Sequence, residues 1–142
     1  MSLLAAVPEG ATVTVDSAPI IYVLDGRSKL ADRFQEIFAA VEAGRNRIVI
    51  SAITVAEVLA GPLRQQREAL VSRYRRVLTQ SRGWSVMDVD ADVAEAAARL
   101  RARHRLELRD AIQLATALQS GSAALVTHDR DFSRLTALHV LS

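Results

Sequence analysis

Short apolar runs alternate with amphipathic stretches along most of this chain. Five runs have the length and composition of strands: 11–16 (ATVTVD), 47–51 (RIVIS), 84–89 (WSVMDV), 123–127 (AALVT) and 137–141 (ALHVL). Between them, apolar residues recur at helical spacing, as in the stripe Leu30, Phe34, Ile37, Phe38 and Val41. Strands that alternate with helices predict an α/β fold with a mainly parallel sheet covered by helices.

Residues with cap chemistry predict where several helices begin and end. Gly26, Gly44 and Gly121 predict the ends of helices over 17–25, 29–43 and 108–119. Asp90 predicts the start of another helix.

The helix that begins near residue 52 has its own signals. Thr54 and Glu57 have the spacing of a capping box, and Gly61-Pro62 predicts that this helix stops there. A separate, mostly polar helix is then expected over 63–81.

A length of 142 residues suits one domain, which we expect over residues 11–142, with residues 1–10 as a loose N-terminal extension. The chain contains no Cys, which excludes disulfides, a thiolate nucleophile and a Cys-based zinc site. No apolar run reaches membrane-spanning length, and MSLLAAVPEG lacks the features of a signal peptide. These features predict a cytoplasmic protein with no membrane partner.

The basic residues are almost all arginine. The formal net charge is only +2, but 17 of the 18 basic residues are Arg, and Lys29 is the exception. Two stretches, 64–82 and 99–109, are rich in Arg. Arg binds phosphate through paired donors, so these stretches suit a nucleic-acid surface, although solvated helix faces would have the same composition.

Acidic residues stand where predicted strands end or apolar helices begin. They are Asp16, Glu57, Asp110 and the pair Asp129 and Asp131. In open α/β sheets ligands bind beyond the carboxyl ends of the strands, which brings all but Asp110 to one edge on topology alone. Clustered carboxylates repel one another unless they are protonated or hold a cation, and hard divalent cations prefer such oxygen ligands.

Each acid also has a local explanation. Glu57 could serve only as the capping partner of Thr54, Asp110 could complement a helix dipole, and the others could form caps or turns. Such local roles do not require the acids to meet. We interpret four further acids as structural residues of caps and turns: Asp25, Asp88, Asp90 and Asp92.

Four stretches resemble the successive motifs of the PIN domain family, and most closely its VapC toxins. They are VTVDSAPIIYVLDG, ISAITVAEVLAGPLR, LELRDAIQLATAL and LVTHDRDFSRL, and the resemblance covers roughly residues 12–141. It implies a PIN-like three-layer sandwich with about five mainly parallel strands. It also implies a Mg²⁺- or Mn²⁺-dependent endoribonuclease that forms a homodimer and is inhibited by a VapB-like antitoxin.

Carried over by residue, the resemblance assigns the acidic site to Asp16, Glu57, Asp110 and Asp129. Asp16 and Asp110 are the expected main metal ligands, and Asp131 is a rival for the fourth position. Ser17 and Thr127 match small hydroxyl residues that support the metal shell. His128 is expected to be a turn residue beside the site. The N-terminal extension departs from the family, whose first motif usually lies nearer the terminus.

Three other kinds of function can be compared with the sequence: a non-cleaving binding module, a receiver domain and a nucleotide-binding domain. A PIN-like module could bind RNA or a partner without cutting, and a partner could use the helices at 29–43 and 52–80. A phosphoacceptor receiver domain needs a Lys near the site, and Lys29 lies at the start of a predicted helix instead. A nucleotide-binding domain is disfavoured because neither glycine-rich phosphate motif occurs.

Overall fold

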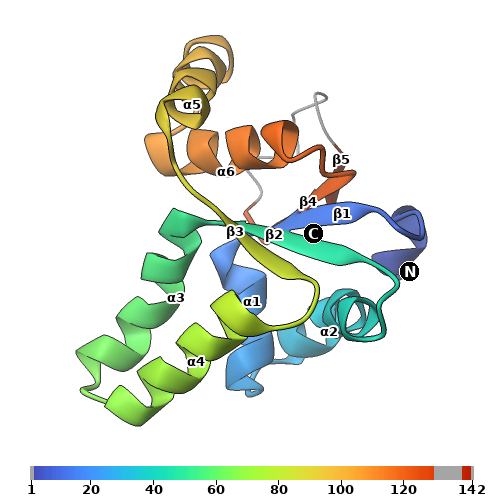
Figure 1. Cartoon of the computed structure of the whole chain (residues 1–142), viewed down its shortest axis with the longest axis vertical. Helices are drawn as coiled ribbons and strands as arrows, with labels where there is room; N and C mark the ends of the chain where they lie inside the picture. The colour runs from blue at the N-terminus through green and yellow to red at the C-terminus, as the bar shows by residue number, and fades with distance from the viewer. Residues whose placement is uncertain (1, 130–138, 142) are drawn as a thin grey trace.

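Five parallel strands form one sheet in the computed structural model, which describes residues 2–129 and 139–141. The strands are β1 (Thr12–Val15), β2 (Arg47–Ser51), β3 (Trp84–Met87), β4 (Ala124–Val126) and β5 (His139–Leu141). Their order is β3-β2-β1-β4-β5, and every neighbouring pair is parallel (Figure 1). The predicted α/β fold with a parallel sheet is confirmed.

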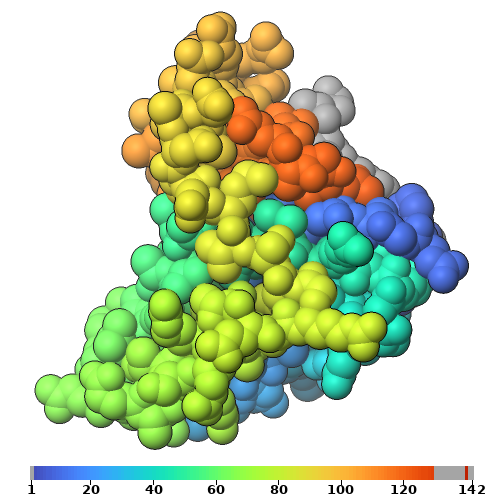
Figure 2. Space-filling view, in the orientation of Figure 1, coloured from blue at the N-terminus to red at the C-terminus, as the bar shows by residue number. Residues whose placement is uncertain are grey.

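Helices cover both faces of the sheet and complete a three-layer structure. They are α1 (Ser17–Asp25), α2 (Lys29–Glu42), α3 (Ala52–Arg64), α4 (Glu68–Gln80), α5 (Ala91–His104) and α6 (Leu108–Gln119). Helices α1 to α4 lie on one face, and α5 and α6 lie on the other (Figure 1). In the space-filling view α5 stands at one end of the molecule and the α3–α4 hairpin at the other (Figure 2). No helix in the described part of the chain is long and apolar enough to cross a membrane.

The sheet separates two hydrophobic cores. Phe34, Ile37 and Leu78 are buried against Ile48 and Ile50 on the face that carries α1 to α4. The second core is smaller and is formed mainly by α5 and α6, with these buried residues: Val93, Ala97, Leu100, Leu106, Ala111, Leu114, Ala115, Ala117 and Leu125. The apolar character expected of the helix at 108–119 is explained by this position between the sheet and α5.

The predicted capping box of Thr54 and Glu57 is wrong. The N-cap of α3 is Ser51, whose Oγ accepts a hydrogen bond from the backbone N–H of Ile53 at 3.3 Å. Thr54 is fully buried and its Oγ1 accepts a 2.7 Å hydrogen bond from Gln113 Nε2. The helix begins three residues earlier than the box requires, which places Glu57 in the second turn and frees its side chain from capping.

Helix α3 also does not stop at Gly61-Pro62. It continues to Arg64, with Pro62 inside its last turn. Near a helix end a proline removes one backbone hydrogen bond, and Pro62 is buried, so packing offsets that loss. The next helix, α4, therefore begins only at Glu68, after a turn in which Gln66 has a φ of 56°.

The N-terminal segment is packed onto the domain rather than loose. Residues 4–6 form a short 3-10 helix, η1 (Leu4–Ala6), and Val7 is buried in the main core. Arg45 and Asn46 donate hydrogen bonds to the carbonyl oxygens of Val7 and Pro8 at 2.9 and 2.8 Å. Composition did not indicate these contacts because they come from the loop before β2.

Candidate active site

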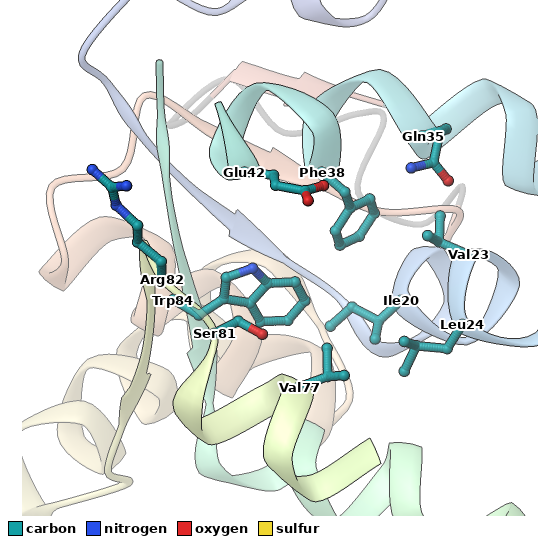
Figure 3. Close-up of a pocket in the computed structure, with 10 residues that line it drawn as sticks. All are labelled: Ile20, Val23, Leu24, Gln35, Phe38, Glu42, Val77, Ser81, Arg82 and Trp84. Atoms are coloured by element: carbon teal, nitrogen blue, oxygen red, sulfur yellow. The ribbon is translucent and has the colours of Figure 1, made fainter. Parts of the chain in front are cut away.

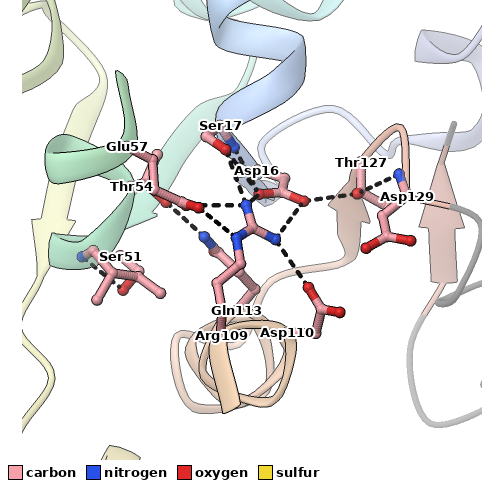
Figure 4. Close-up of polar contacts among 11 residues, drawn as sticks. Asp16, Ser17, Ser51, Thr54, Glu57, Arg109, Asp110, Gln113, Thr127 and Asp129 are labelled. Atoms are coloured by element: carbon pink, nitrogen blue, oxygen red, sulfur yellow. Dashed lines mark hydrogen bonds and ion pairs between the residues drawn. The ribbon is translucent and has the colours of Figure 1, made fainter. Parts of the chain in front are cut away.

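Three carboxylates from three different elements converge at the carboxyl edge of the sheet. Asp16 follows β1 and is the N-cap of α1, Glu57 lies in the second turn of α3, and Asp110 lies in the first turn of α6. Figure 4 shows all three around the guanidinium of Arg109. The structure brings these three acids to one guanidinium, and the local roles of Asp16 and Asp110 at helix starts coexist with this arrangement.

Arg109 donates to every one of these carboxylates. Its Nε and Nη2 contact the two carboxylate oxygens of Glu57 at 2.5 and 3.0 Å. Its Nη1 contacts Asp110 Oδ1 at 2.9 Å and Asp16 Oδ2 at 3.3 Å. Nη2 also donates to Asp16 Oδ1, and to Ser17 Oγ at 2.9 Å.

Asp16 is held in place by further donors that do not involve Arg109. Its Oδ1 accepts from the backbone N–H of Ser17 at 2.7 Å, and its Oδ2 accepts from Thr127 Oγ1 at 2.8 Å. Asp16 and Thr127 are both buried, at 2% and 0% exposure. Ser17 and Thr127 therefore lie where the sequence places supporting residues, directly beside the first acid.

Asp129 lies on the open side of the same cluster. Its backbone N–H donates to Thr127 Oγ1 at 3.0 Å, and its charge acts on Asp110. Asp131, its rival for the fourth position, lies outside the described residues.

His128 packs away from the carboxylates. Its Nδ1 lies 3.0 Å from Tyr22 Oη, and its ring makes edge contacts with the rings of Tyr22 and Phe34, at centroid distances of 5.5 and 6.2 Å. These contacts tie the segment after β4 to α1 and α2. His128 is thus the turn residue that the sequence indicates.

The electrostatics of the cluster are dominated by crowded negative charge. Burial of the Arg109 guanidinium disfavours its charge, but hydrogen bonds to Glu57 and Asp16 outweigh burial and raise the pKa of Arg109 above its usual value. Burial also raises the pKa of Asp110, and repulsion by Asp129 and Asp16 adds to this, while the Arg109 hydrogen bond opposes it. Three carboxylates and one guanidinium leave this group with excess negative charge.

Arg109 and Gln113 are residues of the site that were not predicted from the sequence. Arg109 stands in the first turn of α6, where the helix dipole disfavours a cation, and that mismatch was an available signal. Gln113 lies one turn further along α6 and is fully buried. Its Nε2 donates to Thr54, while its Oε1 has no hydrogen-bond partner among the residues that the structure describes. No pattern in the sequence indicates this second contact between α6 and α3.

The chemistry of this donor set fits a hard divalent cation. Asp16, Glu57 and Asp110 offer carboxylate oxygens, and the contacts with Arg109 show that these oxygens can surround one cation. As the side chains stand, however, no three Asp, Glu, His or Cys residues within the described ranges are arranged to hold a metal ion. The guanidinium occupies the space that the three carboxylates share.

A groove of about 340 Å³ opens beside Glu57, between α1 and the α3–α4 hairpin. Three arginines line it: Arg27, Arg64 and Arg67. All three are exposed, and Arg27 lies 3.7 Å from Asp25. Part of the first Arg-rich stretch therefore borders the carboxylate cluster.

Comparisons with solved structures find this fold in toxin–antitoxin systems. A toxin–antitoxin complex from Klebsiella pneumoniae is similar at 28% identity, with a TM-score of 0.70, over 92% of this chain and 96% of that chain. VapBC2 from Rickettsia felis, bound to a promoter DNA fragment, is similar at 16% identity and a TM-score of 0.72, over 91% and 96% of the two chains. VapC20 from Mycobacterium tuberculosis, described as a sarcin–ricin loop cleaving toxin, is similar at 18% identity and a TM-score of 0.69, over 85% and 92%.

Sequence comparison identifies the family directly. No curated protein matches the chain. The sequence model of the PIN domain matches residues 13–138, which include most of β1 and every acid of the cluster. The parallel sheet, the acids at its carboxyl edge and this match agree, and the chain belongs to the PIN domain family, with a VapC-like structure.

Proposed function

We propose that this protein is a divalent-metal-dependent endoribonuclease and acts as the toxin of a VapBC-type pair. The observation that carries the proposal is the convergence of Asp16, Glu57 and Asp110 on one cation-sized space at the carboxyl edge of the sheet. Such an arrangement costs stability through charge repulsion and is difficult to explain as a purely structural feature.

Each residue of the site would have its own role in metal binding and catalysis. A bound Mg²⁺ or Mn²⁺ supplies a more acidic water and neutralises charge on the scissile phosphate. Asp16 is the best-fixed ligand, because Ser17 and Thr127 orient both of its oxygens. Asp110 is the second ligand, and Glu57 and Asp129 act directly or through water. Glu57 borders the groove lined by arginines, which suits an RNA strand that approaches from that side.

Replacement of Asp16 by Asn tests this proposal. The change keeps the shape of the side chain and removes its charge, so we expect the rate of RNA cleavage to fall by at least about 100-fold. A loss of about 100-fold is the upper end of what removal of a residue that only supports a metal ligand would cause. Asp92→Asn, which changes an exposed acid in the first turn of α5, is the matched control and should cleave at the wild-type rate. Cleavage that persists both in Asp16→Asn and in excess chelator would refute the proposal.

A non-cleaving RNA- or partner-binding module is the second candidate, and Arg109 is the observation that favours it. A guanidinium that never leaves the carboxylates would keep a metal out. The two candidates differ in the wild-type protein: the nuclease binds Mn²⁺ and cuts RNA, whereas the module binds RNA with no metal-dependent cleavage.

We also propose that a VapB-like antitoxin docks in the apolar groove between α2 and α4. This groove has a volume of about 520 Å³ and is lined by Ile20, Val23, Leu24, Phe38, Val77 and Trp84 among others (Figure 3). Trp84 is the only tryptophan of the chain, so the tryptophan fluorescence of the protein reports on the surroundings of this residue, which include the groove. Emission from Trp84 should change when the product of a neighbouring antitoxin gene is added. An unchanged spectrum in a formed complex would place the partner elsewhere.

A further inference from the structure

The position of Arg109 raises a question about how a metal could enter this site. The guanidinium makes hydrogen bonds to both oxygens of Asp16, both oxygens of Glu57 and one oxygen of Asp110. A divalent cation bound by the same carboxylates needs several of these oxygens. A divalent cation placed between the same carboxylates would overlap in space with the guanidinium and would be repelled by its charge.

We propose that Arg109 is a resident cation that competes with the divalent metal for Asp16, Glu57 and Asp110, and so sets the metal concentration at which the site becomes competent. The inference rests on the proposed function, since it requires that the site bind a metal. It concerns the occupant of the site in the absence of metal, which the nuclease activity alone does not define.

Three features of the structure indicate competition rather than permanent occupation. The Arg109 side chain is 32% exposed, so a path to solvent exists. Its place in the first turn of α6 is unfavourable for a cation, so the carboxylates are what hold it inward. The negative charge of the cluster also exceeds the single positive charge of Arg109, so the group still attracts a divalent cation.

The carboxylates do not depend on Arg109 alone for their placement. Asp16 keeps its bonds from the backbone N–H of Ser17 and from Thr127 Oγ1 when the guanidinium leaves. Asp110 is 5% exposed, and Ala111, which follows it in α6, is fully buried in the second core. Loss of Arg109 therefore removes a competitor and leaves the ligands in place. A residue that served only to position the ligands would have the opposite effect on metal affinity.

Binding of Mn²⁺ to the metal-free protein, without RNA, tests the inference. Free Mn²⁺ is measured by electron paramagnetic resonance during titration of the wild type and of Arg109→Met, which keeps the apolar stem and removes the charge. We expect Arg109→Met to bind Mn²⁺ about 10-fold more tightly or better, which corresponds to roughly 1.4 kcal/mol. Arg109→Lys, with its single ammonium in place of the guanidinium fork, should fall between the two.

Arg99→Met is the matched control, because Arg99 lies on the exposed face of α5, away from the cluster, and its guanidinium pairs with Glu95 at 3.4 Å. It should bind Mn²⁺ as the wild type does. Equal or weaker binding by a folded Arg109→Met overturns the inference and leaves the proposed function intact. If Arg109→Met fails to fold, the same judgement applies to Arg109→Lys. Absence of Mn²⁺ binding in the wild type and in both Arg109 variants overturns the inference and the proposed function together.

Discussion

The coupling between Arg109 and Asp16 in the metal-free protein can be measured as a free energy of unfolding. Arg109→Met removes the guanidinium and leaves Asp16 and Asp110, whose side chains are 3% and 8% exposed, without their cation. Asp16→Asn instead removes one carboxylate charge and keeps one amide oxygen, which can replace only one of the two oxygens that accept from Ser17 and Thr127. The two variants and their combination form a double-mutant cycle.

The structure sets the size of the expected effects. Removal of one partner of a fully buried ion pair costs roughly 3–5 kcal/mol, and exposed pairs are worth roughly 0–1 kcal/mol. Arg109 and Glu57 are each 32% exposed, which places this cluster between the two limits, so we expect Arg109→Met to cost about 2 kcal/mol. On the Asp16→Asn background, Arg109→Met leaves fewer carboxylates without a cation, so its cost in stability should fall to about 1 kcal/mol.

Urea unfolding followed by circular dichroism, in chelator and at low ionic strength, gives all four stabilities. Thermal unfolding should show the same order, with Arg109→Met about 4–8 °C below the wild type. If Arg109→Met lowers the free energy of unfolding by the same amount in the wild-type and Asp16→Asn backgrounds, within about 0.3 kcal/mol, the guanidinium does not stabilise Asp16 and the expected coupling is refuted.

Three further predictions concern single residues. Because the pKa of Asp110 is raised, the folded state keeps this proton at pH values where the unfolded state has lost it, so the contribution of Asp110 to stability is greatest at acid pH and is lost as pH rises through the folded pKa. The stability of metal-free Asp110→Asn relative to wild type should therefore grow from acid to neutral pH. A difference that stays constant with pH would contradict this. Gly83→Ala should cost more than Gly44→Ala in urea unfolding, because both have φ above 80° but only at Gly83 would a Cβ meet Val41, at 2.9 Å; equal costs would exclude that contact as the reason. Asp90→Ala should cost about 1 kcal/mol by loss of the 2.9 Å cap to the N–H of Val93, with RNA cleavage unchanged, and lost cleavage in a folded variant would link Asp90 to the site.

Several features of this protein follow from local sequence alone. The β1 and β2 strands are apolar runs whose buried residues the sequence indicates directly, and the cap of α5 at Asp90 is a contact within three residues. Parallel strands place their carboxyl ends at one edge, so the approach of Asp16 and Glu57 also follows from the order of strands and helices.

Other features depend on contacts between segments far apart in the chain. The sequence indicates a cap at Thr54, because the actual partner of its side chain, Gln113, lies 59 residues away. It indicates a helix end at Pro62, because the burial that stabilises Pro62 inside the helix is a tertiary property. The sequence predicts a loose segment before β1, because the loop residues that hold this segment in place lie more than 30 positions away along the chain.

Arg109 shows most clearly what the tertiary structure decides. In the sequence it is one arginine among several on a polar stretch, and its neighbour Asp110 is its only local partner. The fold brings Asp16 from 93 residues away and Glu57 from 52 residues away to the same guanidinium. The sequence determined which residues carry charge, whereas the packing of α6 against the sheet decided that this cation lies among the acids, because electrostatic partners are set by distance in space.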